Sequence, residues 1–303
     1  MSQHEKPVLN GSLPAVNDAE GTGVPGGLPG VVDAHVHVFP DGVFSALWKW
    51  FDTHAWPVRY RMSAGDLVSF LLERGLWHVV ALQYAHKPGI ADGLNRFMAD
   101  LCRSYPGRLT GLAAVFPGED DAAGILERAF ESGLAGVKLH AHVQCFDMNS
   151  PEMDVIYRSC SRAEKPLVIH AGREPKSPAY ACDPYEICGA EKVCRVLDSY
   201  PELKICVPHL GADEFEAYAE LIEARDNLWL DTAMAVTDYL PMGNPVKLSA
   251  LRPDRVMYGS DFPNIPYAWD RELKALACCG LSESRLEKLL WKNACGFFGI
   301  EIK

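Results

Sequence analysis

The chain has 303 residues, of which 48% are hydrophobic and 23% are charged. This composition supplies enough apolar side chains for a core and differs from that of disordered proteins. The formal net charge of -11 argues against a nucleic-acid partner, because binding a polyanion needs clustered Lys and Arg, and no such cluster occurs along the chain. We therefore expect a globular protein whose partner is a small-molecule substrate.

The first 29 residues are rich in Gly, Pro, Asn and Ser and have no apolar period of either kind. We expect residues 1–29 to form a flexible or loosely draped N-terminal arm. The arm lacks the basic stretch and the apolar run of a signal peptide, and no apolar run in the chain is long enough to span a bilayer. The sequence thus predicts a cytoplasmic protein without a membrane partner, and it leaves a homo-oligomer open.

From residue 30 to residue 303, short apolar runs alternate with longer amphipathic stretches, which is typical of repeated β-α units in one α/β domain. Eight such units favour a (β/α)8 TIM barrel, with a doubly wound open sheet as the alternative. The predicted strands are Val31–Phe39, His78–Tyr84, Leu109–Phe116, Ala135–Ala141, Leu167–Ala171, Lys204–His209, Leu228–Asp231 and Arg255–Asp261. The predicted helices include Asp92–Ser104, Asp121–Ser132, Pro151–Ala163, Ala190–Ser199 and Phe215–Ala224.

The first predicted strand carries Asp33, His35 and His37 at alternate positions. Residues two apart on a strand point to the same side, so these three side chains should share one face. If the other face packs on helices, they look into the barrel near the carboxyl end of the strand, where barrel enzymes place their sites. Taken alone, two histidines on one face are a weak indication of a metal site.

Three further predicted strands end on a side chain that can bind a metal, namely His170, His209 and Asp261. If each were an isolated polar residue satisfied by its own neighbours, four separate coincidences would be needed to explain the pattern. Convergence on one divalent metal explains them together, because His and Asp are common ligands of zinc and related ions. The pattern therefore predicts a metal site at the carboxyl ends of the strands.

The motifs that contain these residues resemble the amidohydrolase superfamily, and within it the amidohydrolase-related group of lactonases, aromatic-acid decarboxylases and hydratases. The resemblance covers nearly all of the chain from Val31 to Ile300. Together the motifs are specific for the superfamily and much less specific for a reaction. They are Asp-x-His-x-His at Asp33–His37, Gly-Val-Lys-Leu-His at Gly136–His140, His170, Pro-His-Leu-Gly at Pro208–Gly211, Tyr-Gly-Ser-Asp-Phe-Pro at Tyr258–Pro263 and Asn-Ala-x-x-Phe-Phe-Gly at Asn293–Gly299.

The resemblance implies that His35, His37, His170 and Asp261 hold one divalent metal, Zn²⁺ first and Mn²⁺ second. It also implies that His209 lies beside the metal and polarises the substrate or transfers a proton. Asp33 occupies a position that carries an additional acidic ligand in some decarboxylases of the group. Coordination by Asp33 and an orienting role behind the ligands are both open.

Lys138, His140 and His142 should share one strand face by the same period of two, so all three could look toward the site. Lys138 and His140 are candidates for binding substrate. In binuclear members of the superfamily, a lysine on this strand is carboxylated and bridges two metals. An unmodified Lys138 would instead bind a substrate anion. We expect His142, two residues further, to lie outside the metal's ligands. In the loop after His170, Arg173 could clamp a substrate carboxylate, and a salt bridge with Glu174 or another acid is the alternative.

The resemblance implies an enzyme, and the reaction expected first is hydrolysis of an ester, lactone or amide in a small carboxylated or hydroxylated substrate. In that mechanism, Asp261 accepts the proton of a metal-activated water. The first alternative is a metal-dependent, non-oxidative decarboxylase of the same family. The second is a barrel that binds a metabolite without turning it over, which the presence of Asp261 and His209 disfavours.

Overall fold

The computed structural model describes residues 17–237 and 247–302. Within these residues, eight strands are present, and each lies inside the range predicted for it. The strands are β1 (Val32–His37), β2 (His78–Leu82), β3 (Leu109–Gly111), β4 (Val137–His140), β5 (Leu167–His170), β6 (Ile205–Val207), β7 (Leu228–Asp231) and β8 (Val256–Met257).

All of the strands run parallel and follow one another in chain order, in one sheet of β1 to β3 and a second of β4 to β8. Single parallel bridges join the two sheets at both edges, from Val36 to Phe262 and from Ala113 to Val137. Backbone hydrogen bonds reinforce these edges, because Ala113 N donates to Gly136 O at 2.8 Å. The strands therefore follow one another in a ring, which is the predicted (β/α)8 arrangement rather than an open sheet.

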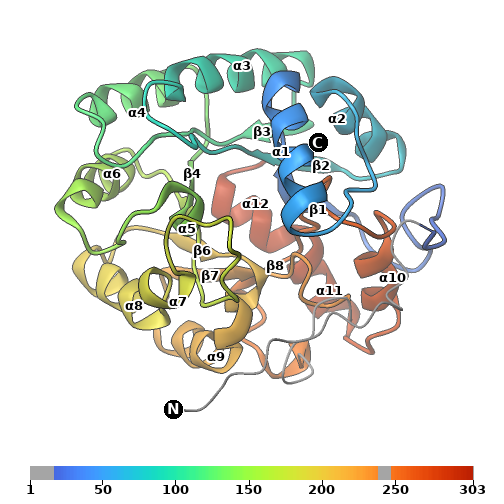
Figure 1. Cartoon of the computed structure of the whole chain (residues 1–303). Coiled ribbons are helices and arrows are strands. Elements are labelled where there is room, and N and C mark those ends of the chain that lie inside the picture. The colour runs from blue at the N-terminus through green and yellow to red at the C-terminus, as the bar shows by residue number, and fades with distance from the viewer. Residues whose placement is uncertain (1–16, 238–246, 303) are drawn as a thin grey trace.

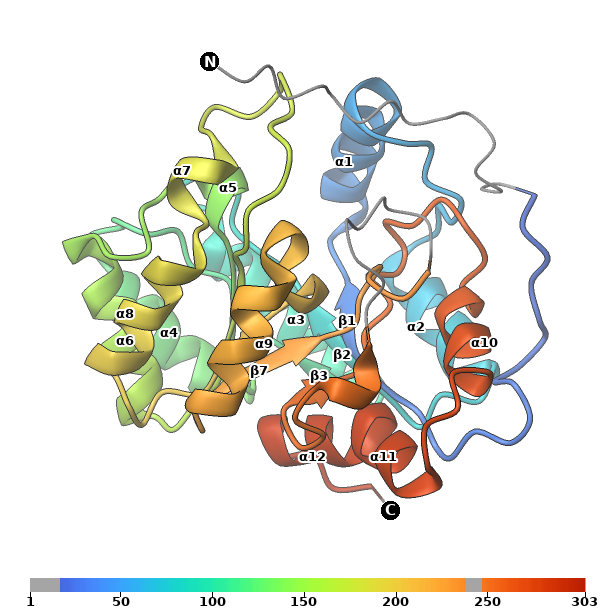
Figure 2. The ribbon, with the colours of Figure 1, turned by 90° about the horizontal axis from the view of Figure 1, so that it is seen from below.

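The helices surround the strands (Figure 1). Those that were predicted between the third and seventh strands agree with the structure to within one residue at each end. Seen from below, α1, α5 and α7 lie on one side of the strands, and α11 and α12 lie on the opposite side (Figure 2). The helices are α1 (Asp41–His54), α2 (Ala64–Glu73), α3 (Ala91–Ser104), α4 (Ala122–Glu131), α5 (Ala141–Gln144), α6 (Pro151–Arg162), α7 (Pro184–Ile187), α8 (Ala190–Ser199), α9 (Phe215–Ala224), α10 (Arg271–Ala277), α11 (Glu283–Glu287) and α12 (Asn293–Phe298).

The apolar side chains form a large cluster between strands and helices and a smaller one beneath the metal-ligand candidates. In the smaller cluster, Val32, Val80 and Met257 from three strands pack with Phe297 and Phe298 of α12. Each large side chain that is buried in this way contributes about 1.5–3 kcal/mol to folding. The amino ends of the strands are thus filled with hydrocarbon, and polar side chains gather at the carboxyl ends.

The described part of the predicted arm, residues 17–29, is tied to the domain. Gly21 N donates to Asp270 Oδ2 at 2.8 Å, and Trp269 Nε1 donates to Gly21 O at 3.1 Å. Arg59 Nη1 also donates to Asp18 O at 2.6 Å. Residues 1–16 lie outside the described residues, and a domain boundary at residue 29 stays a prediction. No helix among the described residues combines the length and the apolar character needed to cross a bilayer.

Candidate metal centre

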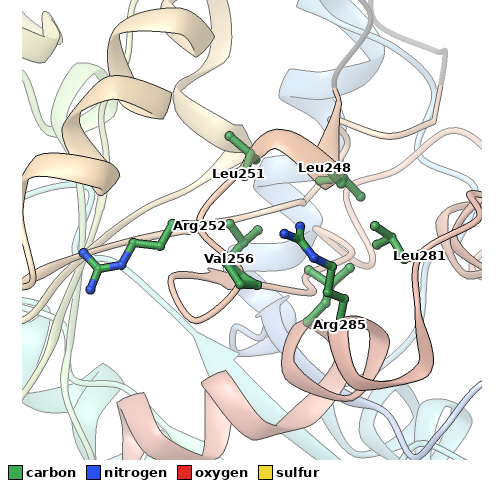
Figure 3. A pocket seen from close by; sticks show the side chains of 8 residues that line it. Leu248, Leu251, Arg252, Val256, Leu281 and Arg285 are labelled. Atoms are coloured by element: carbon green, nitrogen blue, oxygen red, sulfur yellow. The ribbon is translucent and has the colours of Figure 1, made fainter.

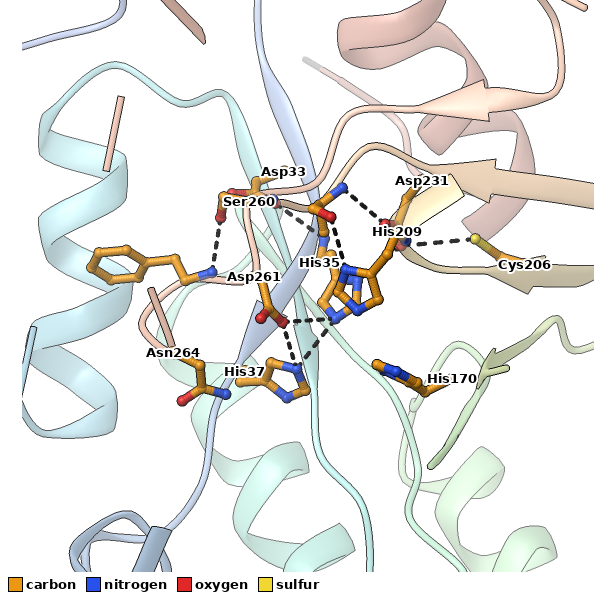
Figure 4. A network of polar contacts seen from close by, with 12 residues as sticks. Asp33, His35, His37, His170, Cys206, His209, Asp231, Ser260, Asp261 and Asn264 are labelled. Atoms are coloured by element: carbon orange, nitrogen blue, oxygen red, sulfur yellow. Dashed lines mark hydrogen bonds and ion pairs between the residues drawn. The ribbon is translucent and has the colours of Figure 1, made fainter. Parts of the chain in front are cut away.

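Three predicted ligands meet at the junction of β1 and the segment after β8. His35 Nε2 lies 3.2 Å from His37 Nε2 and 3.2 Å from Asp261 Oδ1, and His37 Nε2 lies 2.9 Å from the same oxygen. All three side chains are buried. We call them the first metal group (Figure 4).

The hydrogen bonds of His35 show what fits between these atoms. Its Nδ1 lies 2.8 Å from a carboxylate oxygen of Asp231, which can only accept, so the ring donates its Nδ1 proton there. In the neutral ring, Nε2 then presents a lone pair toward the carboxylate of Asp261 and the ring of His37. These atoms repel one another unless a proton or a cation lies between them. Ligands about 2.0–2.2 Å from one ion lie about 3 Å apart, so the observed distances fit a bound metal.

The pKa values of these groups also indicate a place for positive charge. Burial alone would lower the pKa of His35, but the carboxylate of Asp231 outweighs it and raises the pKa to about 8. Burial lowers the pKa of His37 to about 4, so this ring is neutral and can offer a lone pair. Burial would raise the pKa of Asp261, but its hydrogen bonds to the two histidines hold it well below its usual range. The group thus combines an anion with imidazoles, as divalent metals require.

Asp231 is a functional candidate that the sequence analysis missed. It ends β7, and besides His35 Nδ1 it accepts a hydrogen bond from the backbone N of His209 at 3.1 Å. It therefore fixes the ring orientation of His35, which is the role of residues that support metal ligands. Asp231 also ends an apolar run on a polar side chain, as His170 and His209 do, so the same signal in the sequence could have identified it.

Asp33 lies outside the first metal group. Its carboxylate accepts hydrogen bonds from the backbone N of His35 at 3.1 Å and from Ser260 N at 3.1 Å. The expected alternation of β1 fails here, because the register with β2 shifts between Asp33 and Val36. Ala34, expected on the outer face, packs in the smaller apolar cluster with α12. The contacts of Asp33 are those of an orienting carboxylate behind the ligands.

Gly259 allows the segment after β8 to approach β1 at the first metal group. A Cβ atom at this position would lie 2.6 Å from the Cβ of His35 and 3.5 Å from the Cγ of Asp231. Gly259→Ala is therefore expected to displace His35, destabilise the fold by about 1–3 kcal/mol and weaken metal binding about 10–100-fold. Gly296→Ala is the matched control, because nothing lies within 4 Å of its Cβ position. Thermal unfolding and metal titration of both variants test this, and equal metal affinity in the two would contradict it.

His209 follows β6 and has a left-handed backbone with φ of 56°. Its Nδ1 lies 2.7 Å from Ala233 O, which can only accept, so this nitrogen carries a proton and Nε2 is left for chemistry. The ring lies 5.3 Å from that of His35 and 4.7 Å from that of His170, measured between centroids. His209 thus lies between these two predicted ligands, and its role beside a metal stays a prediction.

His170, predicted as the fourth ligand, joins a different group. In Figure 4 it lies below His209 and across from His37. Its Nε2 lies 3.1 Å from Glu174 Oε2, and its ring stacks on that of His140 with 4.1 Å between centroids. The predicted set of four is therefore divided between two groups, because His170 pairs in register with His140 on the neighbouring strand and Glu174 follows in the next loop. That His170 completes the first metal group stays a prediction.

The second group, His140, His142 and His170, is buried, and its ligand atoms lie within 4.8 Å of one another. His142 was expected beyond the ligands on a continuing strand. The strand instead ends at His140, and His142 lies in the short helix α5. Glu174, considered only as a partner of Arg173, contacts His142 and His170. No signal in the sequence pairs this loop glutamate with the two histidines.

Lys138 lies on β4 and is buried, and its Nζ has no hydrogen-bond partner among the described residues. Burial lowers the pKa of its amine to about 8, against the attraction of Asp231 and Asp261. Such an amine is neutral in a larger fraction of molecules than a surface lysine. This suits both open roles, carboxylation and binding of a substrate anion, and the two stay predictions.

Arg173 is occupied by protein oxygens. Its guanidinium pairs with Glu214 at 2.6 Å and with Glu191 at 2.9 Å, and its Nε donates to Tyr185 O at 2.9 Å. The predicted partner Glu174 faces the histidines instead. Clamping a substrate carboxylate would require these contacts to break, so the geometry favours a structural ion pair, although with acids other than Glu174. The substrate-binding role of Arg173 stays a prediction.

A surface pocket is lined by none of the candidate metal ligands (Figure 3). It touches Val256, the first residue of β8, and so lies near the amino end of this strand. It contains no His, Cys or acid, which leaves it without groups for metal or proton chemistry. The lining residues are Leu248, Leu251, Arg252, Pro253, Val256, Leu281, Arg285 and Leu289.

Comparisons with known proteins agree with the observed fold. A 5-carboxyvanillate decarboxylase of Novosphingobium aromaticivorans, solved with manganese and 4-hydroxy-3-methoxy-5-nitrobenzoic acid, is 18% identical with a TM-score of 0.66, and the match covers 93% of this chain and 100% of that chain. A TIM-barrel protein of Bordetella bronchiseptica is 16% identical with a TM-score of 0.69, over 89% and 99% of the two chains. A 2,6-dihydroxybenzoate decarboxylase from Rhizobium is 14% identical with a TM-score of 0.62, over 90% and 99%. These similarities support the barrel fold.

The family assignment comes from the sequence model described as Amidohydrolase, which matches residues 32–300. The match includes every strand of the barrel and both groups of candidate ligands. It confirms the resemblance that the motifs indicated. The chain belongs to the amidohydrolase family.

Proposed function

We propose that this protein is a metal-dependent, non-oxidative decarboxylase of a small carboxylated aromatic acid. The proposal depends on one observation, the convergence of His35, His37 and Asp261 on a point where their atoms repel one another unless a proton or a cation lies between them. The sequence analysis placed hydrolysis first. We reverse that order, because two of the similar structures described above act on aromatic acids.

Aromatic side chains beside the ligands support a flat substrate. The ring of Tyr84 lies 5.9 Å from that of His37 and 5.0 Å from that of His140, edge-on to both. Phe39 stacks on His37 with 6.1 Å between centroids. Aromatic rings contribute favourable stacked or edge-on contacts to one another, so a planar acid would be held between such walls.

A divalent ion held by the first metal group would supply charge to bind the substrate's oxygens and to stabilise the electrons that the departing carboxylate leaves behind. Zn²⁺ and Mn²⁺ both suit these ligands. Lys138 Nζ, buried and unpaired among the described residues, is available to an anionic group of the substrate. His209 can take a proton from solvent at Nε2, because Nδ1 is engaged with Ala233 O.

The proposed step exchanges a carboxylate for a proton. The bond between the ring carbon and the carboxylate breaks, carbon dioxide leaves, and the electron pair that stays on the carbon takes the proton from His209 Nε2. Burial lowers the pKa of His209, which makes its protonated form a better donor. The step needs no oxidant or reductant.

Hydrolysis of an ester, lactone or amide is the second candidate. It is favoured by Asp261, whose carboxylate lies at the first metal group and could accept a proton from an attacking water. The lyase and the hydrolase use the same ligands, and they differ in which atom of water enters the product.

Labelled water therefore tests the proposal. We expect the metal-loaded protein, supplied with hydroxylated benzoic acids in deuterium oxide, to release carbon dioxide and to place deuterium on the ring carbon. Oxygen-18 water should leave no label in the organic product. Hydrolysis of lactones or esters with oxygen-18 in the new carboxylate, and no release of carbon dioxide from any benzoate, would show that the second candidate is correct.

A further inference from the structure

We propose that the chain holds a second divalent metal ion, bound by His140, His142, His170 and Glu174. We call these residues the histidine–glutamate group. Apart from His170, none of them is among the ligands expected for the first metal group. The second site needs no carboxylation of Lys138, and it does not depend on which reaction the protein catalyses.

The positions of the ligand atoms carry this proposal. Glu174 Oε1 lies 3.0 Å from His142 Nε2, and Glu174 Oε2 lies 3.1 Å from His170 Nε2. His140 lies against both histidines, with its ring centroid 4.4 Å from that of His142 and 4.1 Å from that of His170. These distances between nitrogen and oxygen repeat those of the first metal group. They match the spacing of about 3 Å between ligands of one ion.

The fold brings these residues together from two adjacent strand ends. His140 and His170 are register partners at the carboxyl ends of β4 and β5. His142 follows in α5, and Glu174 follows in the loop after β5. The loop is fastened next to the glutamate, because Gly172 N donates to Cys188 O at 2.7 Å. Ligands on such fixed elements keep their geometry, as a metal site requires.

At position 172 of this loop, the backbone conformation suits glycine and would be strained in any residue that has a side chain. Gly172 has a φ of +93°, and a Cβ atom there would lie 2.3 Å from Gly211 O. Arg173 then pairs with Glu214 and Glu191. The ion pairs of Arg173 and the conformation of Gly172 together direct Glu174 toward the histidines.

The positions of these side chains leave a place for a cation. Both carboxylate oxygens of Glu174 face histidine nitrogens, and the ligand atoms of the three histidines lie within 4.8 Å of one another. Among the described residues, Nδ1 of His140 is buried without a hydrogen-bond partner. The Glu174 side chain is 22% exposed, and the three histidines are buried. A divalent cation between these side chains would accept their lone pairs, as it does in metal sites of imidazole and carboxylate ligands.

Aromatic side chains cover the group on one side. The ring of Tyr180 lies 4.5 Å from that of His142, and Trp50 of α1 stacks on Tyr180 with 5.6 Å between centroids. Such a cover limits access of water and strengthens the interaction of the ligands with an ion. The alternative to a metal is that the two Nε2–H groups donate hydrogen bonds to Glu174, with the same contacts and no ion.

Counting metal distinguishes these alternatives without any assay of turnover. The full chain is loaded with Zn²⁺, separated from free ion by gel filtration, and its zinc is measured by elemental analysis. We expect two equivalents in the natural chain and one in His142→Ala, Glu174→Gln and His35→Ala. The variant that combines His142→Ala with His35→Ala should bind none. His86→Gln, which removes an exposed histidine, is the control and should keep two.

The same zinc measurement can contradict the proposal. One equivalent in the natural chain, or two equivalents in both His142→Ala and Glu174→Gln, would overturn it, as would loss of the second equivalent in the His86→Gln control. Thermal unfolding in chelator identifies any variant that does not fold. The Glu174→Gln substitution keeps the shape of the side chain. The number of zinc ions bound by the natural chain is measured without any substitution. If the proposed decarboxylation fails, the zinc count still stands as a separate result.

Discussion

Replacing His35 by alanine is expected to remove the ion of the first metal group and to lower turnover about 10³-fold or more. His35 contributes Nε2 to this group, and its Nδ1 connects the group to Asp231 at 2.8 Å. A bound metal stabilises the charge of a transition state by several kcal/mol, and each 1.36 kcal/mol corresponds to a factor of ten in rate, so a loss of about 4 kcal/mol gives this effect. Elemental analysis and initial rates of the same preparation measure both consequences.

Asp231→Asn is expected to have a smaller effect on metal binding than His35→Ala. It leaves the three ligand side chains in place but weakens the orientation of His35, so we expect a loss of about 10–100-fold in metal affinity. His86→Gln should match the natural chain in both measurements. A His35→Ala protein that keeps its full metal content and its rate would show that the first metal group is not the metal centre.

Replacing His209 by asparagine is expected to lower turnover about 10²–10⁴-fold while the metal content stays the same, since this is the usual effect of removing one positioned acid–base group. The asparagine amide can still donate to Ala233 O, as Nδ1 does at 2.7 Å, but it offers no nitrogen that exchanges protons at the position of Nε2. The backbone N of His209, which donates to Asp231, is unchanged. The experiment therefore isolates proton transfer from the architecture of the site.

Transfer of solvent deuterium to the product is the second measurement on this variant. If His209 delivers the proton, the rate at which the His209→Asn variant forms its residual product should no longer depend on proton exchange between residue 209 and the solvent. A His209→Asn protein with an undiminished rate would assign the proton to another group, and Asp261 is then the next candidate. A His209→Asn protein that has lost its metal would instead identify His209 as a ligand.

The barrel and the meeting of three candidate metal ligands could be predicted from the sequence alone. Apolar runs that end on a polar residue locate the strands, because a strand buried on both faces needs continuous hydrocarbon and chemistry gathers where it ends. Among the described residues, each of the eight strands lies inside a range predicted from such an apolar run, and four of these runs carry or end on a candidate ligand. Since parallel strands bring their carboxyl ends to one side, His35, His37 and Asp261 could be placed together before any coordinates were known.

The partners of the remaining polar side chains are set by contacts that form only in the folded chain. The register shift in β1 separates Asp33 from the first metal group, and no pattern of two along the strand reveals such an irregularity. Arg173 was predicted to clamp a substrate carboxylate or to pair with Glu174 or another acid, and the acid it meets is Glu214, which is 41 positions away in sequence. The path of a loop depends on contacts between distant segments, and local sequence does not specify them.

The partners of His170 within the site could likewise not be predicted from local sequence. The sequence identified it as a strand-end histidine, which is correct, and assigned it to the set of His35 and His37. Its rotamer is decided by the neighbouring strand, where His140 stacks on it, and by Glu174 in the following loop. Strand ends are determined by local hydrophobicity. The direction of a side chain is determined by packing and charge from residues that only the folded chain brings near, which is why the histidine–glutamate group became visible in the structure alone.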